Sequence, residues 1–267
     1  MYRAVMMMEK DAKIVLNRQV SLDTFLIGLQ SAEMAGRARP GQFVMLRVGS
    51  GMDPLLRRPF SIFGTEGDTF HILYRVVGRA TAILAETGKG KVVSVLGPLG
   101  RGFEMPREDQ SPLLVGGGMG VAPLFFLARI LERGEFMMGF GTAEEIAVKA
   151  QRRGLRMTVS IATDDGTEGH RGFVTDLLEA SLKHLLRGNS TPWIVACGPA
   201  AMLKKVAATA RHHKVPCQVS LEASMACGLG ACQGCAVPAS PHEKRAYFHV
   251  CHDGPVFPAG RIDWEKL

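Results

Sequence analysis

The cysteines near the C-terminal end of the chain have a spacing that could hold a redox cofactor. Cys227, Cys232 and Cys235 form a C-x4-C-x2-C run, and Cys251 follows after fifteen further residues. This is the ligand order of a plant-type [2Fe–2S] site, in which each iron takes two thiolates. Three glycines inside the run suit a tightly curled loop, because glycine adopts positive φ and lets backbone N–H groups approach inorganic sulfur.

Two other uses of cysteine compete with a cluster. A zinc site usually pairs two short C-x2-C motifs, whereas only one x2 spacing occurs here. A disulfide framework is typical of short exported chains. This chain has 267 residues, and Glu9, Lys10 and Asp11 interrupt any signal-peptide core. The residues therefore favour an iron–sulfur cluster.

Two glycine-containing turns are candidates for binding a dinucleotide, because backbone N–H groups and the helix dipole at such turns face a phosphate. The first follows a buried strand at 112–115 but does not match G-x-G-x-x-G, so a turn needed only for packing is the alternative. The second follows a strand at 193–196, and its Cys197 could simply be a small buried residue. Both fall at the carboxyl edge of the predicted sheet, where ligands bind. The predicted crevice residues are Gly116, Gly117, Gly118, Gly120, Cys197, Gly198 and Pro199.

A third group of candidate binding residues consists of two arginine-containing segments. Arg57-Arg58-Pro59-Phe60-Ser61 offers a guanidinium fork and a hydroxyl to a pyrophosphate, and the segment 74–81 adds further arginines. A solvated arginine face is the alternative for either segment. Nicotinamide exchanges two electrons as a hydride, whereas a [2Fe–2S] cluster passes one, and a flavin can convert between them. If the nicotinamide site and the cluster site both exist, a flavin is implied between them. The N-terminal part of the chain is the only segment that remains to bind this flavin.

The elements that must position these residues fall into three predicted units. Residues 1–105 contain short apolar strands separated by glycine-rich breaks, which predicts a small antiparallel β barrel. Residues 106–215 alternate buried strands and helices, which predicts an open parallel sheet. Residues 216–267 are expected to form a small cluster-binding subdomain stabilised partly by metal. Strands are expected within 12–28, at 42–48, 60–63, 70–77, 92–96, 112–115, 136–140, 157–162, 193–196 and 247–250, and helices at 80–86, from Pro123 and after Pro199.

Composition narrows the class of protein. The chain is 46% hydrophobic and 21% charged, which is ordinary for a protein with real cores. Its net charge of +7 is scattered, and aromatics are only 7%, so anionic cofactors, an acidic partner or solvated charge are favoured over nucleic acid. The apolar window 112–131 contains glycines, prolines and Arg129, so no membrane span is expected. We expect a cytoplasmic protein with reduced thiols.

Taken in order, these motifs resemble those of the ferredoxin-reductase superfamily. The order is Arg-Pro-x-Ser, Tyr-Arg-Val-Val-Gly, Gly-Gly-Gly-x-Gly-x-x-Pro, Cys-Gly-Pro and then the four cysteines. More closely, essentially the whole chain is similar to the electron-transfer subunits of class 1B dihydroorotate dehydrogenases. The most specific parts of the resemblance are 225–232 and 250–257.

The resemblance implies an FAD-binding barrel, an NAD-binding α/β domain and a [2Fe–2S] subdomain. NAD(H) would dock over the flavin between the two turns. One departure is the pair Ala80-Thr81, where the family usually has Gly-Thr, so that a methyl group could crowd a phosphate. The implied FAD residues are Arg58, Pro59, Phe60, Ser61, Leu73, Tyr74, Arg75, Ala80 and Thr81, and the implied cluster ligands are Cys227, Cys232, Cys235 and Cys251.

The resemblance also implies a partner. A separate FMN-containing catalytic subunit would oxidise dihydroorotate to orotate, and electrons would pass through the [2Fe–2S] cluster and FAD of this chain to NAD⁺. The chain itself would then contain no catalytic residue for dihydroorotate. The expected assembly is a heterotetramer with two copies of each subunit and the cluster at their interface.

Other hypotheses remain open at this point. A related flavin/[2Fe–2S] subunit of an NAD(P)H:ferredoxin or sulfide-linked oxidoreductase is one, although an Asp often replaces the first cysteine there and Cys227 favours the first interpretation. A redox sensor or a zinc-binding structural protein is another. Asp164 and Asp165 could contact ribose hydroxyls or cap a turn, so NAD is preferred over NADP mostly by resemblance. Phe257 could lie against the flavin or pack the last loop.

Overall fold

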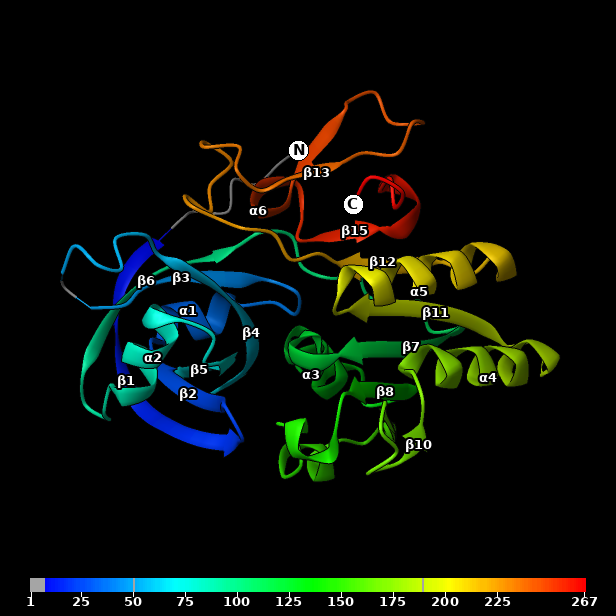
Figure 1. The fold of residues 1–267 in the computed structure, drawn as a ribbon, viewed down its shortest axis with the longest axis horizontal. Helices are drawn as coiled ribbons and strands as arrows, with labels where there is room; N and C mark the ends of the chain where they lie inside the picture. Colours follow the sequence, from blue (N-terminus) through cyan, green and yellow to red (C-terminus); the bar gives the residue numbers. More distant parts are fainter. Residues whose placement is uncertain (1–7, 50, 189) are drawn as a thin grey trace.

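The computed structural model describes residues 8–49, 51–188 and 190–267. A β barrel and an α/β lobe lie side by side, and the C-terminal segment lies along their shared edge (Figure 1). The predicted fold class is therefore confirmed: an antiparallel barrel, a largely parallel open sheet and a C-terminal cysteine region. In the described part of the chain no helix is both long and apolar enough to cross a membrane.

The barrel closes six strands in the order β1-β2-β5-β4-β3-β6, with antiparallel pairing throughout. Its interior is apolar because alternate side chains point inward, and Ile14, Ile27, Phe70 and Ile72 are fully buried. The barrel elements are β1 Met8–Ser21, β2 Thr24–Gln30, α1 Ala32–Arg37, β3 Phe43–Arg47, β4 Arg58–Glu66, β5 Thr69–Arg75, α2 Arg79–Glu86 and β6 Val92–Leu99.

The second lobe is a seven-stranded sheet in the order β10-β9-β8-β7-β11-β12-β15. All its pairings are parallel except the last, in which β15 runs antiparallel to β12. Its strands are β7 Gln110–Gly117, β8 Glu135–Phe140, β9 Thr158–Thr163, β10 His170–Arg171, β11 Thr191–Cys197, β12 Cys217–Ser220 and β15 Val256–Pro258. Its helices are α3 Val121–Leu131, α4 Val174–Arg187 and α5 Ala200–His213, with short 3₁₀ turns η1 Gly118–Gly120, η2 Ala143–Glu145 and η3 Gln151–Gly154.

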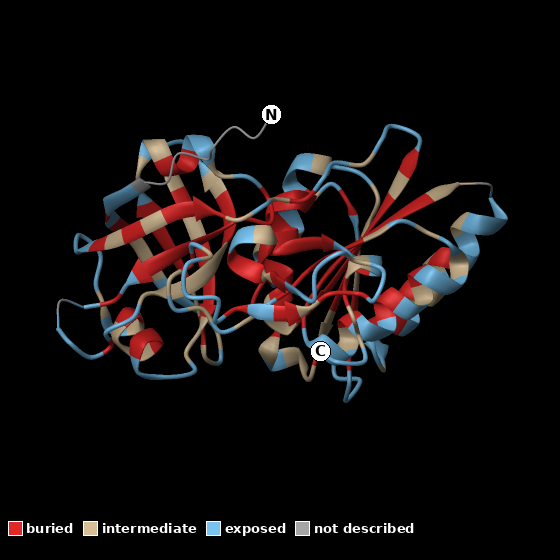
Figure 2. Ribbon diagram, turned by 90° about the horizontal axis from the view of Figure 1, so that it is seen from above, coloured by how far each residue is buried: buried red, intermediate tan, exposed pale blue. Residues whose placement is uncertain are grey.

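Helix α4 was not expected from the sequence. It buries Val174, Leu178 and Leu182, which recur every four residues, while its other faces are largely polar and exposed. This spacing gives one narrow apolar stripe that fits against the sheet. Figure 2 shows the same division, with buried positions concentrated along the strands and the inner sides of the helices.

The two lobes are joined by an apolar contact between β4 and α3. The rings of Phe63 and Phe125 stack with centroids 4.6 Å apart, and both residues are buried. A stacked aromatic pair contributes about 0.5–1.5 kcal/mol beyond its buried area. The lobes are therefore in direct apolar contact, which matters because the candidate site lies where they meet.

The C-terminal region departs from the sequence expectation in its details. A strand was expected at 247–250, but β14 Tyr247–His249 ends one residue earlier, and α6 Val250–Asp253 carries Cys251 in a helical turn. Strand β14 pairs with β13 Ala236–Pro238 in a small separate sheet, and η4 Ala259–Arg261 follows β15. Strands β12 and β15 both lie in the large sheet although they fall within 216–267. The proposed boundaries 1–105, 106–215 and 216–267 stay a prediction.

Candidate functional site

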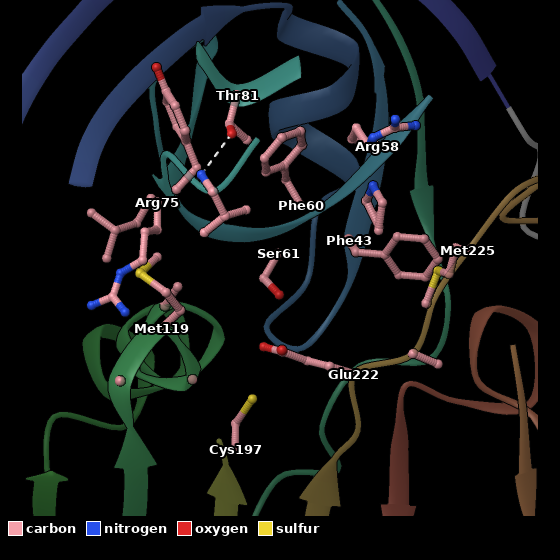
Figure 3. Close-up of a pocket in the computed structure, with 18 of the residues that line it drawn as sticks. Phe43, Arg58, Phe60, Ser61, Arg75, Thr81, Met119, Cys197, Glu222 and Met225 are labelled. Carbon is pink, nitrogen blue, oxygen red and sulfur yellow. Dashed lines mark hydrogen bonds between the residues drawn. The ribbon is translucent and has the colours of Figure 1, made fainter. Parts of the chain in front are cut away.

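A cavity of about 810 Å³ lies where the barrel meets the carboxyl edge of the sheet (Figure 3). It brings together every predicted flavin and dinucleotide residue except Gly116. A Cβ at Gly116 would come within 2.9 Å of Val121 Cγ1, so this glycine is required for the packing of β7 on α3. The lining residues that were predicted are Arg58, Pro59, Phe60, Ser61, Leu73, Tyr74, Arg75, Ala80, Thr81, Gly117, Gly118, Gly120, Cys197, Gly198 and Pro199.

The barrel wall of this cavity is formed by β4, β5 and the start of α2. The Tyr74 hydroxyl donates to Asn17 Oδ1 at 3.1 Å, and burial raises the pKa of Tyr74 to about 12. The Thr81 hydroxyl accepts from the backbone N–H groups of Val77 (3.0 Å) and Gly78 (3.1 Å), so it fixes the turn that enters α2. Ala80 is 6% exposed and belongs to the barrel core, and it also lines the cavity.

The two glycine turns form the opposite wall, and they contact each other. Strands β7 and β11 are parallel neighbours with Gly116 opposite Cys197, which places both turns at the same edge. A Cβ at Gly120 would come within 2.2 Å of the Cys197 carbonyl oxygen, and one at Gly117 within 2.6 Å of Met202 Sδ. The backbones approach so closely that a side chain has no room. The prediction that the turns lie together is confirmed by this geometry.

Sequence reasoning missed Glu222, which follows β12 and lines the cavity. Its carboxylate lies between the Ser61 hydroxyl and the Cys197 thiol (Figure 3). Glu222 keeps an exposed surface, but desolvation of its carboxyl raises the pKa above its ordinary value. Cys197 is 2% exposed. The pKa of its thiol is raised mainly by burial and to a smaller extent by the negative charge of the nearby Glu222. The signal that could have located Glu222 is its position two residues after β12, a strand of the parallel sheet.

The four predicted cluster cysteines are all free thiols and lie in one region as two pairs. The Sγ atoms of Cys235 and Cys251 are 3.2 Å apart. Cys227 accepts from the N–H of Cys232 at 3.5 Å and of Leu229 at 3.3 Å. Burial acts to raise the pKa of Cys227, but these N–H groups outweigh it and lower the value to about 6. The pKa of Cys251 is raised to about 12, mainly by burial and to a smaller extent by its contact with Cys235.

This arrangement fits a binuclear cluster, because each iron takes only two thiolates. In the described ranges no group of three or more His, Cys, Asp or Glu side chains is arranged to hold a single metal ion. Gly228 and Gly230 have positive φ, and a Cβ at Gly228 would come within 2.7 Å of Met45 Cγ. Glycine thus lets the loop curl tightly against the barrel. The ligand assignment itself stays a prediction.

Three other residues from the sequence analysis can now be placed. Phe257 is 1% exposed and packs on Phe248 with centroids 5.4 Å apart, which favours the packing role. The Asp165 carboxylate accepts from the N–H and the hydroxyl of Thr167 at 2.9 and 2.6 Å, so it does cap a turn. The N–H of Asp164 donates to the Phe140 carbonyl oxygen at 3.1 Å, which places this exposed residue at the end of β8.

Comparisons with known proteins agree with this geometry. Residues 222–263 match the family described as the iron–sulfur cluster binding domain of dihydroorotate dehydrogenase B. The chain is 36% identical over 261 residues to "Dihydroorotate dehydrogenase B (NAD(+)), electron transfer subunit" of Desulforamulus reducens, covering 96% of this chain and 98% of that relative. The protein of the same name from Bacillus mycoides is 39% identical over 267 residues, covering 96% and 99%.

A solved structure gives the same fold. A chain of the NADH-dependent reduced ferredoxin-NADP oxidoreductase, studied for flavin-based electron bifurcation, superposes with a TM-score of 0.82 at 30% identity. The match covers 96% of this chain and 91% of that one. The similarity therefore extends over both lobes and the cysteine region.

Proposed function

The chain belongs to the family of dihydroorotate dehydrogenase B (NAD(+)) electron transfer subunits, and from this premise we propose that it links a dihydroorotate-oxidising partner to NAD⁺. It accepts electrons singly from that partner and delivers them in pairs to NAD⁺. One observation carries the proposal: a single cavity is lined by the Arg58–Ser61 strand, by both glycine turns and by Glu222, and the chain runs on from Glu222 directly to the cluster loop.

Two cofactors are required by this function, and the residues fit both. When bound, FAD exchanges electrons singly or as a hydride, and a [2Fe–2S] cluster exchanges one at a time. We propose that Arg58 and its neighbours on β4 and β5, with Ala80 and Thr81, hold FAD. Cys227 and Cys232 would hold one iron, and Cys235 and Cys251 the other.

The chain's own residues then have definable tasks. The turns at Gly117–Gly120 and Cys197–Pro199 present backbone N–H groups to the anionic part of NAD(H). The Glu222 carboxyl lies between Ser61 and Cys197, and desolvation raises its pKa above the ordinary value. Cys197 and Ser220 beside Glu222 are buried, so polar interactions on the inner side of the cavity are stronger than in solvent.

We further propose the parts of the assembly that the family name leaves open. The partner is an FMN-containing catalytic subunit, and two copies of each subunit form a heterotetramer. The unit boundaries are 1–105, 106–215 and 216–267. The compartment is the cytoplasm, since thiols stay reduced there and six free cysteines suit it.

The decisive experiment is coexpression with the candidate FMN subunit. Dihydroorotate-dependent reduction of NAD⁺ is expected in the complex and in neither subunit alone. Purified chain should also carry bound flavin and the visible absorption of an iron–sulfur cluster. NAD⁺ reduction by the FMN subunit alone would contradict the proposal, as would a chain that contains zinc without iron.

A second candidate is favoured by one comparison. The 30% identity and TM-score of 0.82 to the NADH-dependent reduced ferredoxin-NADP oxidoreductase chain suit a subunit that exchanges electrons with a ferredoxin. Copurification with a ferredoxin-linked flavoprotein, and no response to dihydroorotate, would favour this candidate over the first.

A further inference from the structure

Arg75 occupies a special place in the cavity wall. It ends β5 of the barrel, yet Figure 3 shows its guanidinium beside Met119, which belongs to the glycine turn of the other lobe. Its main chain lies in the wall proposed for FAD, whereas its charged end faces the turn proposed for NAD(H). The side chain is 30% exposed, so a ligand in the crevice could reach it.

The guanidinium lies between two carboxylates and hydrogen-bonds to neither. Its Nε is 3.3 Å from Asp23 Oδ1, and one terminal nitrogen is 3.7 Å from Glu145 Oε2. Nε is also shielded from solvent without a hydrogen-bond acceptor among the described residues. A guanidinium has five N–H donors in a planar fork that matches phosphate oxygens. The donors of Arg75 are therefore poorly satisfied by the protein.

Glu145 belongs to the opposite lobe and is held at the ligand-binding edge of the sheet. It ends η2, which follows β8, and β8 is the neighbour of β7 and its glycine turn. The N–H of Gly141 donates to Glu145 Oε2 at 3.4 Å, and a Cβ at Gly141 would come within 2.8 Å of Oε1. The carboxylate thus rests on backbone that leaves room for it, with one oxygen directed at Arg75.

We propose that Glu145 is an internal competitor for the Arg75 guanidinium, which pairs with Glu145 when the crevice holds no dinucleotide and with the pyrophosphate of NAD(H) when it does. The inference rests on the proposed function, because it assumes that NAD(H) binds at the glycine turns. Pyrophosphate can accept two parallel N–H bonds, which are stronger than an ion pair at 3.7 Å. Glu145 therefore weakens dinucleotide binding and ties the two lobes together in its absence.

The test measures the Kd for NAD⁺ by calorimetry on the full chain loaded with FAD and cluster. Glu145→Gln should lower the Kd about two- to fivefold, the range that an exposed ion pair supplies. Glu144→Gln is the matched control, because Glu144 is an exposed neighbour in the same 3₁₀ turn, and it should leave the Kd unchanged. Arg75→Gln should raise the Kd about tenfold or more, as expected for lost hydrogen bonds to a charged ligand.

The double variant separates competition from a general charge effect. In the Arg75→Gln background, Glu145→Gln should no longer lower the Kd, because coupled residues are not additive. Three results would each contradict the proposal that Glu145 competes for Arg75. Glu144→Gln could lower the Kd for NAD⁺ as much as Glu145→Gln does, Glu145→Gln could still lower the Kd in the Arg75→Gln background, or Glu145→Gln could leave the Kd unchanged. Flavin content is measured for every variant. If Arg75→Gln loses flavin, the comparison of the Kd for NAD⁺ between Glu145→Gln and Glu144→Gln tests the proposal by itself. Absence of NAD⁺ binding to the wild type would instead contradict the proposed function.

Discussion

The cavity and the cysteine loop are built in opposite ways. The cavity draws its lining from distant parts of the chain, from Phe43 to Pro255, and much of that lining is buried. The loop takes three of its four thiols from 227–235, and Cys232 at its tip is exposed. Placing the site between two lobes lets it exclude water, whereas a local loop at the surface can meet a partner protein. Each region suits the kind of electron transfer proposed for it.

Removing a proposed cluster ligand should have the largest effect and should separate the two regions. Cys232→Ser should reduce iron content and partner-linked NAD⁺ reduction at least about 100-fold, since even changes around a metal ligand cost up to that much. NADH oxidation with an artificial acceptor should persist in part, because the cavity does not contain Cys232. Equal loss of both activities would mean that the cluster also supports the cavity.

Crowding the glycine turns should break the cavity and spare the loop. Gly120→Ala places a methyl group 2.2 Å from the Cys197 carbonyl oxygen, so the backbones must separate. We expect a loss of about 3 kcal/mol in the free energy of unfolding, the upper end of the overpacking range, and weaker binding of NADH, with iron content retained. Thermal unfolding and NADH titration measure both effects.

A matched control for that variant is Gly36→Ala in α1. A Cβ there has no neighbour within 4 Å, and the residue lies in a helix. Alanine should be neutral or should stabilise by up to about 1 kcal/mol. Similar destabilisation by both variants would show that the close approach of the two turns is not the cause.

The carboxylate of Glu222, which lines the cavity, gives the cavity a pH dependence. The pKa of Glu222 is raised in the folded chain by burial, so its contribution to stability is fully present below the unfolded value and is lost as the pH rises through the folded value. Because Glu222 is exposed, solvent screens this effect, so Glu222→Gln should be more stable than the wild type above that range by less than about 1 kcal/mol. Parallel stability–pH curves for the two proteins would contradict this.

The smallest effect is expected far from both regions, where the side chain of Glu179 on α4 accepts from His213 on α5 at 3.1 Å. The hydrogen bond to His213 is the main cause that lowers the pKa of Glu179. Its stabilisation is present above the unfolded pKa and is lost as the pH falls through the lower folded value. Because the pair is partly exposed, with side-chain exposure of 35% for Glu179 and 16% for His213, Glu179→Gln should cost about 1 kcal/mol or less by chemical denaturation, with flavin, iron and NADH binding unchanged. A change in any of these would mean that α4 and α5 are coupled to the cavity.

Much of this architecture could be predicted because its signals are local. The thiol spacing of 227–235, the apolar alternation of the barrel strands and the strand–glycine–helix turns each depend on a few consecutive residues. The predicted helix after Pro199 corresponds to α5, and the strands lie close to their expected positions. The predicted strand 247–250 is one residue longer than β14, which ends at His249. Val250 is apolar like a strand residue, but it begins the helical turn that carries Cys251.

What the sequence by itself determined is the fold class, the order of the three regions and the thiol motif, since periodicity and short-range backbone geometry are written in neighbouring residues. Only the tertiary structure decided that β12 and β15 join the large sheet, that Glu222 lies beside Ser61 and Cys197, and that Arg75 of the barrel faces Glu145 of the other lobe. These pairs are separated by up to 161 residues, from Ser61 to Glu222. No local pattern encodes such contacts, because they arise from how the lobes pack, which depends on the whole chain.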